Sequence, residues 1–203
     1  MLTHPLLPKL RQLKLSGMLH TLDLRAAQAT ERGLTPTEFL ALLLDDELER
    51  REQNRMAYRL ALSGCDAQKS LAMFDFAAAP GVNRSLIQEL GTCAFVARHE
   101  NLLLCGPTGV GKSHLANAIA CEALKRGYRV LTRPTHRLLA DLQASRANGT
   151  HQRLFARALG VDLLLLDDFG LQPLGAQAVQ DLYDIISERY EHGSMILTSN
   201  RAF

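Results

Sequence analysis

Eight consecutive residues carry the clearest chemical signal in the sequence. They run from Gly106 to Ser113 as Gly-Pro-Thr-Gly-Val-Gly-Lys-Ser and follow the apolar run 102–105. Glycines let a tight loop turn several backbone N–H groups inward onto an anion, and the start of a following helix adds more. This is the Walker A pattern in its expected context. It predicts a loop that cradles the phosphates of ATP.

The side chains of this loop have separate predicted roles. Lys112 is expected to reach the β- and γ-phosphates, and the hydroxyl of Ser113 to bind Mg²⁺. The residues expected to contact the nucleotide are Gly106, Pro107, Thr108, Gly109, Val110, Gly111, Lys112, Ser113 and His114. The alternative is a Gly-rich turn before an ordinary helix, which the preceding apolar run argues against.

Two later apolar runs end in polar residues that suit phosphate chemistry. Leu163 to Leu166 is followed by Asp167 and Asp168, which is the Walker B pattern. We expect Asp167 to hold Mg²⁺ and Asp168 to polarise the attacking water. Asn200 ends the other run, and its amide can bond the γ-phosphate or that water. The predicted catalytic residues are Lys112, Asp168 and Asn200. A solvated acidic turn and a simple turn asparagine are the alternatives.

Strands and helices that alternate must position these side chains. Helical spacing predicts helices over 113–126, 137–144, 154–159 and 175–190, and apolar runs predict strands near 102–105, 128–132, 161–168 and 194–200. Alternation of this kind is typical of an α/β fold whose parallel sheet is covered by helices on both faces. The fold prediction is therefore a P-loop NTPase sheet.

The first third of the chain has helical spacing alone. Thr35, Pro36 and Glu38 form a capping box, and an apolar stripe follows at Leu40, Leu43, Leu44 and Leu48. Pro80-Gly81 then interrupts the pattern. We expect a small all-helical N-terminal domain over 1–72 that binds DNA or a partner, and an ATP-binding core over 73–203.

The composition excludes several classes of protein. The 203 residues are 47% hydrophobic, and no apolar run approaches the ~20 residues that span a bilayer. No signal peptide is evident, so we expect a cytoplasmic protein without a membrane role. Cys65, Cys93, Cys105 and Cys121 lack the spacing of zinc ligands, and we expect reduced thiols used as small apolar side chains, two of them in core elements.

Positive charge is concentrated in one stretch, although the net charge is only +2. Between Lys125 and Arg157, Asp141 is the single acid, and eight residues are basic: Lys125, Arg126, Arg129, Arg133, Arg137, Arg146, Arg153 and Arg157. Such a surface suits the phosphates of DNA. The row Arg51, Arg55 and Arg59 in the N-terminal helices is a second candidate. For the long stretch, the alternative is a solvated face balanced by acids from elsewhere in the fold. For the row, it is i, i+4 pairing with nearby acids.

Taken together, these segments resemble the IstB-like transposition helper ATPases of insertion sequences and, more distantly, the DnaC-type helicase loaders. The resemblance covers most of the chain, because Leu13 to Met18, Glu38 to Leu43 and Phe74 to Phe76 also look like that family's N-terminal region and linker. It implies an AAA+ ATPase that needs Mg²⁺, binds DNA, forms homo-oligomers and cooperates with a transposase. Asn200 would be its sensor 1 residue.

The resemblance also sets expectations for the C-terminus. The family's cores continue past this sensor strand with a further strand and a helical lid, whose arginines act at the ATP of a neighbouring subunit. The chain ends at Phe203, so we expect that lid to be missing. Arg189 and Arg201 are candidates by location for the arginine that acts on a neighbour.

Three other functions stay open on the sequence alone. A helicase loader of the DnaC type differs only in its partner. A non-hydrolysing, ATP-binding DNA scaffold would retain the phosphate loop without turnover. A P-loop kinase for a small molecule would need an acceptor pocket, and the sequence marks none.

Overall fold

The computed structural model describes residues 5–201, and the chain divides into two compact units, Met1–Tyr58 and Arg59–Phe203. This division comes earlier than the expected boundary after residue 72, because residues 59–72 pack on the sheet-containing unit. The N–H of Asp66 donates to Asn117 Oδ1 at 2.9 Å. A Cβ added at Gly64 would lie 2.6 Å from the carbonyl oxygen of Thr132. The predicted absence of a C-terminal helical lid stays a prediction, because it concerns the chain beyond Arg201, outside the described residues.

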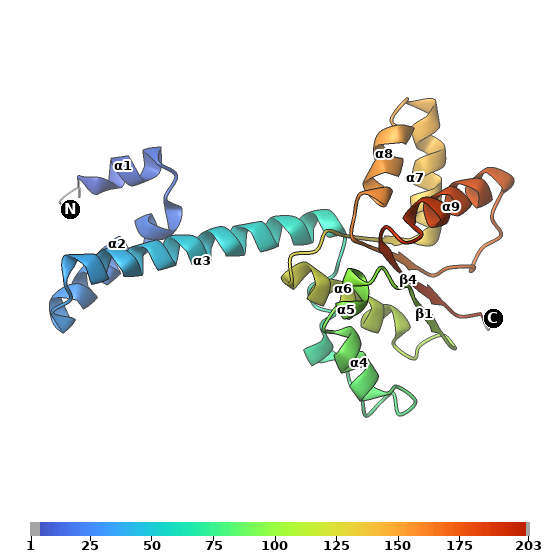
Figure 1. Cartoon of the computed structure of the whole chain (residues 1–203), viewed down its shortest axis with the longest axis horizontal. Coiled ribbons are helices and arrows are strands. Elements are labelled where there is room, and N and C mark those ends of the chain that lie inside the picture. Colours follow the sequence, from blue (N-terminus) through green and yellow to red (C-terminus); the bar gives the residue numbers. More distant parts are fainter. Residues whose placement is uncertain (1–4, 202–203) are drawn as a thin grey trace. The chain divides into compact units, whose positions relative to one another are not determined.

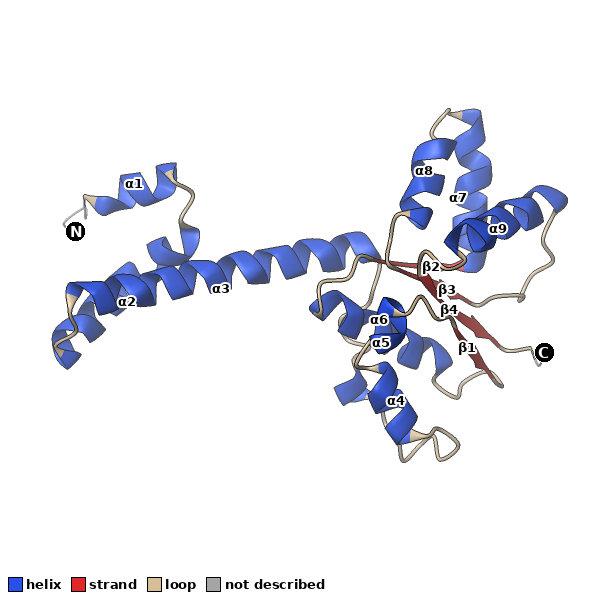
Figure 2. Cartoon of the chain, in the orientation of Figure 1, coloured by secondary structure: helices blue, strands red, loops and turns tan. Residues whose placement is uncertain are grey.

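The first unit contains α1 (Leu6–Gln12), α2 (Ser16–Arg32) and most of α3 (Pro36–Ser63), and Figure 2 shows its described part as helical. Its core is Met18, Leu22 and Leu43. The capping box at the start of α3 is confirmed: Thr35 N–H donates to Glu38 Oε2 at 2.8 Å, and Glu38 N–H to Thr35 Oγ1 at 3.3 Å.

The second unit is built on one sheet of four parallel strands in the order β1-β4-β3-β2. The strands are β1 (Leu102–Cys105), β2 (Val130–Pro134), β3 (Leu163–Asp167) and β4 (Ser194–Ser199). Leu163 to Leu166 are fully buried because β3 lies between two other strands and beneath helices on both faces. The predicted parallel α/β sheet is therefore confirmed.

Helices cover the two faces of this sheet, as Figure 1 shows. On one face lies α6 (Lys112–Lys125), and on the other lie α7 (Thr135–Ala147), α8 (His151–Leu159) and α9 (Ala176–Arg189). The short elements η1 (Leu71–Met73), α4 (Arg84–Leu90) and α5 (Ala94–Ala97) precede β1. The core on the second face joins Leu138, Leu142, Leu166, Leu182 and Ile185.

Two sequence expectations need correction. Cys105 and Cys121 fall in the predicted strand 102–105 and helix 113–126. Cys105 is nevertheless exposed, because β1 is an outer strand of the described sheet, whereas Cys121 and also Cys93 are buried. The helix expected from residue 137 begins at Thr135, directly after β2. Within residues 5–201, no helix is both long and apolar enough to cross a lipid bilayer.

Candidate nucleotide site

The loop between β1 and α6 has the backbone that the glycines predict. Gly109 and Gly111 have φ angles of 88° and 89°, in the left-handed region that glycine adopts without strain. Gly111 precedes the first residue of α6, and no side chain among the described residues caps this helix start. Its first-turn N–H groups are therefore available to an anion, as at other helix N-termini.

Lys112 lies over this loop. Its Nζ donates to the carbonyl oxygen of Pro107 at 2.8 Å. The ammonium group is therefore held among the backbone atoms of the loop, next to the helix start.

One carboxylate joins three elements beneath the loop. Ser113 Oγ donates to Asp167 Oδ1 at 2.8 Å, and Thr198 Oγ1 donates to the same oxygen. The carbonyl oxygen of Asp167 also accepts from Thr135 Oγ1 at 2.9 Å. Asp167 is thus fixed by α6, α7 and β4 at once. Thr198 was not among the predicted site residues, although it lies one position past Leu197, which pairs with Leu166.

The predicted catalytic residues border one open cavity. Its lining is Thr108, Gly109, Gly111, Lys112, Ser113, His114, Asp168, Leu171 and Asn200. Asp168 has a φ of 58° and is exposed, and its N–H donates to Thr198 Oγ1 at 3.0 Å. Aspartate tolerates this conformation better than most residues. Gly106, Pro107, Val110 and Asp167 were predicted site residues but do not line the cavity.

Sequence reasoning missed the segment that packs against the loop. A Cβ added at Gly111 would lie 2.7 Å from Cε2 of Phe74, so the phenyl ring contacts the loop backbone. His114 Nε2 lies 3.0 Å from the carbonyl oxygen of Ser70, and its ring packs edge-on with Phe74 at 5.4 Å between centroids. Phe76 packs on Phe74 at 4.9 Å. The Phe-Asp-Phe sequence was the available signal.

Only some of the basic residues between Lys125 and Arg157 lack an ion pair with a carboxylate among the described residues. Lys125 and Arg126 pair with Glu122, Arg129 pairs with Asp162, and Arg146 pairs with the buried Asp181. For these four residues the alternative of internal ion pairs is correct. Within residues 5–201, no carboxylate pairs with Arg137 or Arg153, and both are exposed. In the N-terminal row, Arg51 pairs with Glu47 and Arg55 with Glu52.

Arg189 cannot act on a neighbouring subunit. It is 2% exposed, and its guanidinium donates to the carbonyl oxygens of Val161 at 2.8 Å and Ser194 at 2.7 Å. Burial lowers its pKa to about 10. The expectation based on its position was wrong because the turn after α9 folds over this side chain, where a Cβ at Gly193 would lie 2.8 Å from its Nη2.

The family model described as "IstB-like ATP binding protein" matches residues 8–203. The chain belongs to this family. One relative is the insertion sequence IS21 ATP-binding protein of Pseudomonas aeruginosa. It is 36% identical over 200 residues, which is 98% of this chain and 76% of that protein. A Mycobacterium tuberculosis protein, also named for ATP binding in an insertion sequence, is 40% identical over 197 residues, covering 95% and 77%.

The IstB-like chain is similar in structure to solved AAA+ proteins. The DnaC helicase loader matches with a TM-score of 0.54 at 27% identity, over 59% of this chain and 68% of that one. DnaA from Aquifex aeolicus, solved with AMPPCP, matches with a TM-score of 0.60 at 25% identity, over 68% and 43%. The IstB-like chain is therefore an ATP-binding P-loop protein of AAA+ fold.

Proposed function

We propose that this chain is an Mg²⁺-dependent ATPase that assists transposition by assembling into an oligomer on DNA when ATP is bound. The observation that carries the proposal is the bond from Ser113 to Asp167, which brings the phosphate loop and the acidic strand end into one site. Asp168 and Asn200 border the same cavity as the loop. The relatives are named as ATP-binding proteins of insertion sequences, and these names support a role in transposition.

The donor set fits a nucleotide with Mg²⁺. A hydroxyl and a carboxylate 2.8 Å apart are hard oxygen ligands, so Ser113 and Asp167 would hold the ion. Mg²⁺ when bound supplies positive charge to phosphate oxygens. Lys112 and the N–H groups at the start of α6 would neutralise charge on the phosphates. Asp168 would accept a proton from the attacking water, which Asn200 would orient.

ATP hydrolysis with and without duplex DNA tests this function. We expect DNA to stimulate turnover. Asp168→Asn should reduce it by about 10² or more, as loss of a general base does, and Lys112→Ala should also reduce it, because the charge on the phosphates is no longer neutralised. The matched controls Lys69→Ala and Asp141→Asn remove equally charged, exposed side chains away from the cavity and should leave the rate without DNA unchanged. Nucleotide binding without turnover in the wild type would favour the non-hydrolysing scaffold instead.

DNA contact is proposed for the unpaired arginines of the basic stretch. Arg137→Glu and Arg153→Glu should weaken duplex binding, and the slope of log K against log salt should fall by about one for each lost phosphate contact. Arg129→Glu is the matched control, because Asp162 already neutralises this guanidinium. Equal losses for all three variants would contradict the assignment.

The likeness to the DnaC helicase loader keeps one other partner in view. A helicase loader would bind the replicative helicase, whereas the insertion-sequence relatives favour a transposase. Binding of the purified chain to each of these proteins, with ATP and Mg²⁺ present, distinguishes the two. Binding to the helicase alone would overturn the transposition role and leave the ATPase assignment intact.

A further inference from the structure

One face of α6 holds the segment of residues 65–74, which we name the strap. The strap follows α3 and precedes α4. Its last residue, Phe74, contacts Gly111 just before α6 begins. The carbonyl oxygen of Ser70 lies 3.0 Å from Nε2 of His114, in the first turn of the helix. This end of the strap therefore lies against the phosphate loop.

Asn117 attaches the other end of the strap to the same helix. Its Nδ2 donates to the carbonyl oxygens of Asp66 at 2.8 Å and Lys69 at 3.1 Å, and its Oδ1 accepts the N–H of Asp66 at 2.9 Å. The side chain is only 6% exposed, so these bonds are shielded from competing water. Because both backbone groups of Asp66 are held by one buried amide, the position of the adjacent Cys65 over α6 is fixed.

Two thiols meet at this point. Cys121 lies one helical turn beyond Asn117, and its Sγ donates to the carbonyl oxygen of Asp66 at 3.7 Å and accepts from Asn117 Nδ2 at 3.5 Å. Cys65 Sγ lies 3.2 Å from Oγ1 of Thr132, in β2. The thiols of Cys65 and Cys121 also share a hydrogen bond. That direct contact leaves no other group between the two sulfur atoms.

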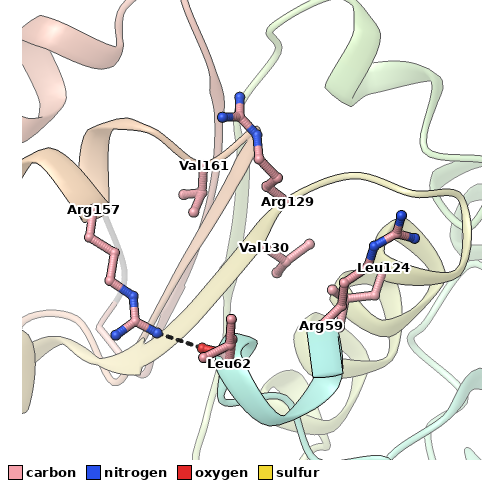
Figure 3. Close-up of a pocket in the computed structure, with 7 residues that line it drawn as sticks. All are labelled: Arg59, Leu62, Leu124, Arg129, Val130, Arg157 and Val161. Atoms are coloured by element: carbon pink, nitrogen blue, oxygen red, sulfur yellow. Dashed lines mark hydrogen bonds between the residues drawn. The ribbon is translucent and has the colours of Figure 1, made fainter. Parts of the chain in front are cut away.

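Figure 3 shows the junction of the three segments that carry these side chains. Leu62 of α3, Leu124 of α6 and Val130 of β2 line one cavity of about 220 Å³. Each of them is two or three residues from a member of the group Cys65, Cys121 and Thr132. The thiol pair therefore belongs to a junction of segments that are distant in the sequence, and a covalent bond between the sulfurs would join the strap to α6 there.

The two thiols differ as an attacking and a resolving thiol must. Cys65 is partly exposed, and the hydrogen bond with Cys121 lowers its pKa to about 7. Cys121 is 4% exposed, and the same hydrogen bond, together with burial, raises its pKa. Burial also raises the pKa of Cys93, to about 11. Peroxides react with thiolates and with accessible sulfur, so Cys65 should react before the two buried thiols.

We propose that Cys65 and Cys121 form a peroxide-sensitive dithiol site, in which a reversible disulfide bond attaches the strap to α6. The thiolate of Cys65 attacks one oxygen of hydrogen peroxide, the O–O bond breaks, and a sulfenic acid and hydroxide result. The sulfur of Cys121 then attacks the sulfur of Cys65. The S–O bond breaks, and the departing hydroxide leaves as water with the proton of Cys121. The two sulfurs together lose two electrons to the peroxide, and a dithiol reductant returns them.

The disulfide would restrict the segment next to the nucleotide cavity. It closes a loop that contains the strap, β1 and the whole phosphate loop. Cross-links that close long loops stabilise a fold mainly by restricting the unfolded chain. We therefore expect oxidation to raise the Tm by roughly 5 °C or more and to slow amide hydrogen exchange in residues 66–74 about tenfold.

Peptide mass spectrometry of the full chain in a Cys105→Ser background tests the site, because that substitution removes the exposed thiol of β1. After treatment with hydrogen peroxide and then iodoacetamide, we expect a peptide pair linked through Cys65 and Cys121, which dithiothreitol separates. Cys93 should remain a free thiol and serves as the internal control. In concentrated urea, where the fold no longer selects the partner, Cys65 should link to Cys93 as readily as to Cys121.

Two variants identify the attacking and the resolving sulfur. Cys121→Ala should stop the reaction at a sulfenic acid on Cys65, which dimedone traps, and Cys65→Ala should leave Cys121 unoxidised. Oxidation of Cys65 to a sulfinic acid in the parent chain, with no linked peptide, would overturn the dithiol site, and this result needs no variant to fold. A linked peptide that leaves the Tm and the hydrogen exchange of the strap unchanged would overturn the attachment of the strap to α6.

Discussion

The hydroxyl of Ser113 donates to Oδ1 of Asp167 at 2.8 Å, across 54 residues of sequence. The serine lies in the first turn of α6, and the aspartate ends β3. Thr198 donates to the same carboxylate oxygen from β4. The two halves of the nucleotide site are therefore joined by the protein's own hydrogen bonds, because a helix and a neighbouring strand both donate to one carboxylate.

Removal of this hydroxyl should separate nucleotide binding from Mg²⁺ binding. A ligand at about one hundred times its Kd stabilises a protein by about 2.7 kcal/mol, which raises the Tm of a domain of this size by roughly 5–10 °C. We expect Mg²⁺ to increase the Tm shift caused by ATP in the wild type but not in Ser113→Ala. The control Ser187→Ala changes an exposed serine on α9. An unchanged Mg²⁺ effect in Ser113→Ala would exclude this serine as a ligand.

Gly111→Ala should distort the loop itself. The new Cβ would meet Phe74 at 2.7 Å, and the φ of +89° is strained for alanine by about 1–3 kcal/mol. We expect a lower Tm and a loss of ATP binding by at least tenfold, measured by calorimetric titration. Gly81→Ala is the matched control, because this glycine has no neighbour within 4 Å of the added Cβ and no left-handed φ. ATP affinity equal to the wild type would show that Phe74 and the loop adapt freely.

Asp181 should make the stability of the sheet-containing unit depend on acid pH. Hydrogen bonds from Arg146 hold the pKa of this carboxyl below its ordinary value of 3.8. The stabilisation is present above that value and is lost as the pH falls through the lower pKa of the folded state. Asp181→Asn should therefore cost about 1.5–3 kcal/mol at pH 7, and this cost should decrease as the pH falls below 3.8.

Urea unfolding of the wild type and Asp181→Asn at pH 7 and at pH 3 measures this difference. Asp141→Asn, which changes an exposed acid on α7, is the control. A penalty for Asp181→Asn that is as large at pH 3 as at pH 7 would mean that shape and packing, not charge, make the contribution.

Contiguous patterns predicted most of this architecture. The run Leu163 to Leu166 predicted a buried parallel strand, because both faces of such a strand are covered. The phosphate loop was recognisable because its residues act through backbone geometry that the glycines themselves determine. The position of Asp168 and Asn200 beside the same cavity as the loop was also predictable, since each follows a strand whose carboxyl end meets the same edge of the sheet; their catalytic roles stay predictions.

Contacts between distant segments could not be predicted in this way. The packing of Phe74 on Gly111 depends on the course of a linker that has no periodic pattern. The charge of the basic stretch was overestimated because the acids that neutralise Arg129 and Arg146, Asp162 and Asp181, lie outside it in the sequence. Arg189 gave no sign of its burial, because its partners are backbone carbonyl groups.

Cys65 should be more reactive than Cys121, the thiol of α6 that it contacts. A hydrogen bond with the Cys121 thiol, supported by Ser63 and Thr132, lowers the pKa of Cys65 to about 7. The same contact, together with burial, raises the pKa of Cys121. Because the thiolate is the nucleophile, alkylation of Cys65 by iodoacetamide should rise with pH around 7 and level off above 8.

Peptide mass spectrometry in a Cys105→Ser background measures this rate without the exposed thiol of β1. Replacement of Cys121 by alanine removes the largest cause of the shift. The pKa of Cys65 should then move toward its ordinary value of 9.0, and its alkylation at pH 7 should slow roughly tenfold or more. Faster labelling of Cys121 than of Cys65 in the parent chain would show that the thiolate resides on the other sulfur.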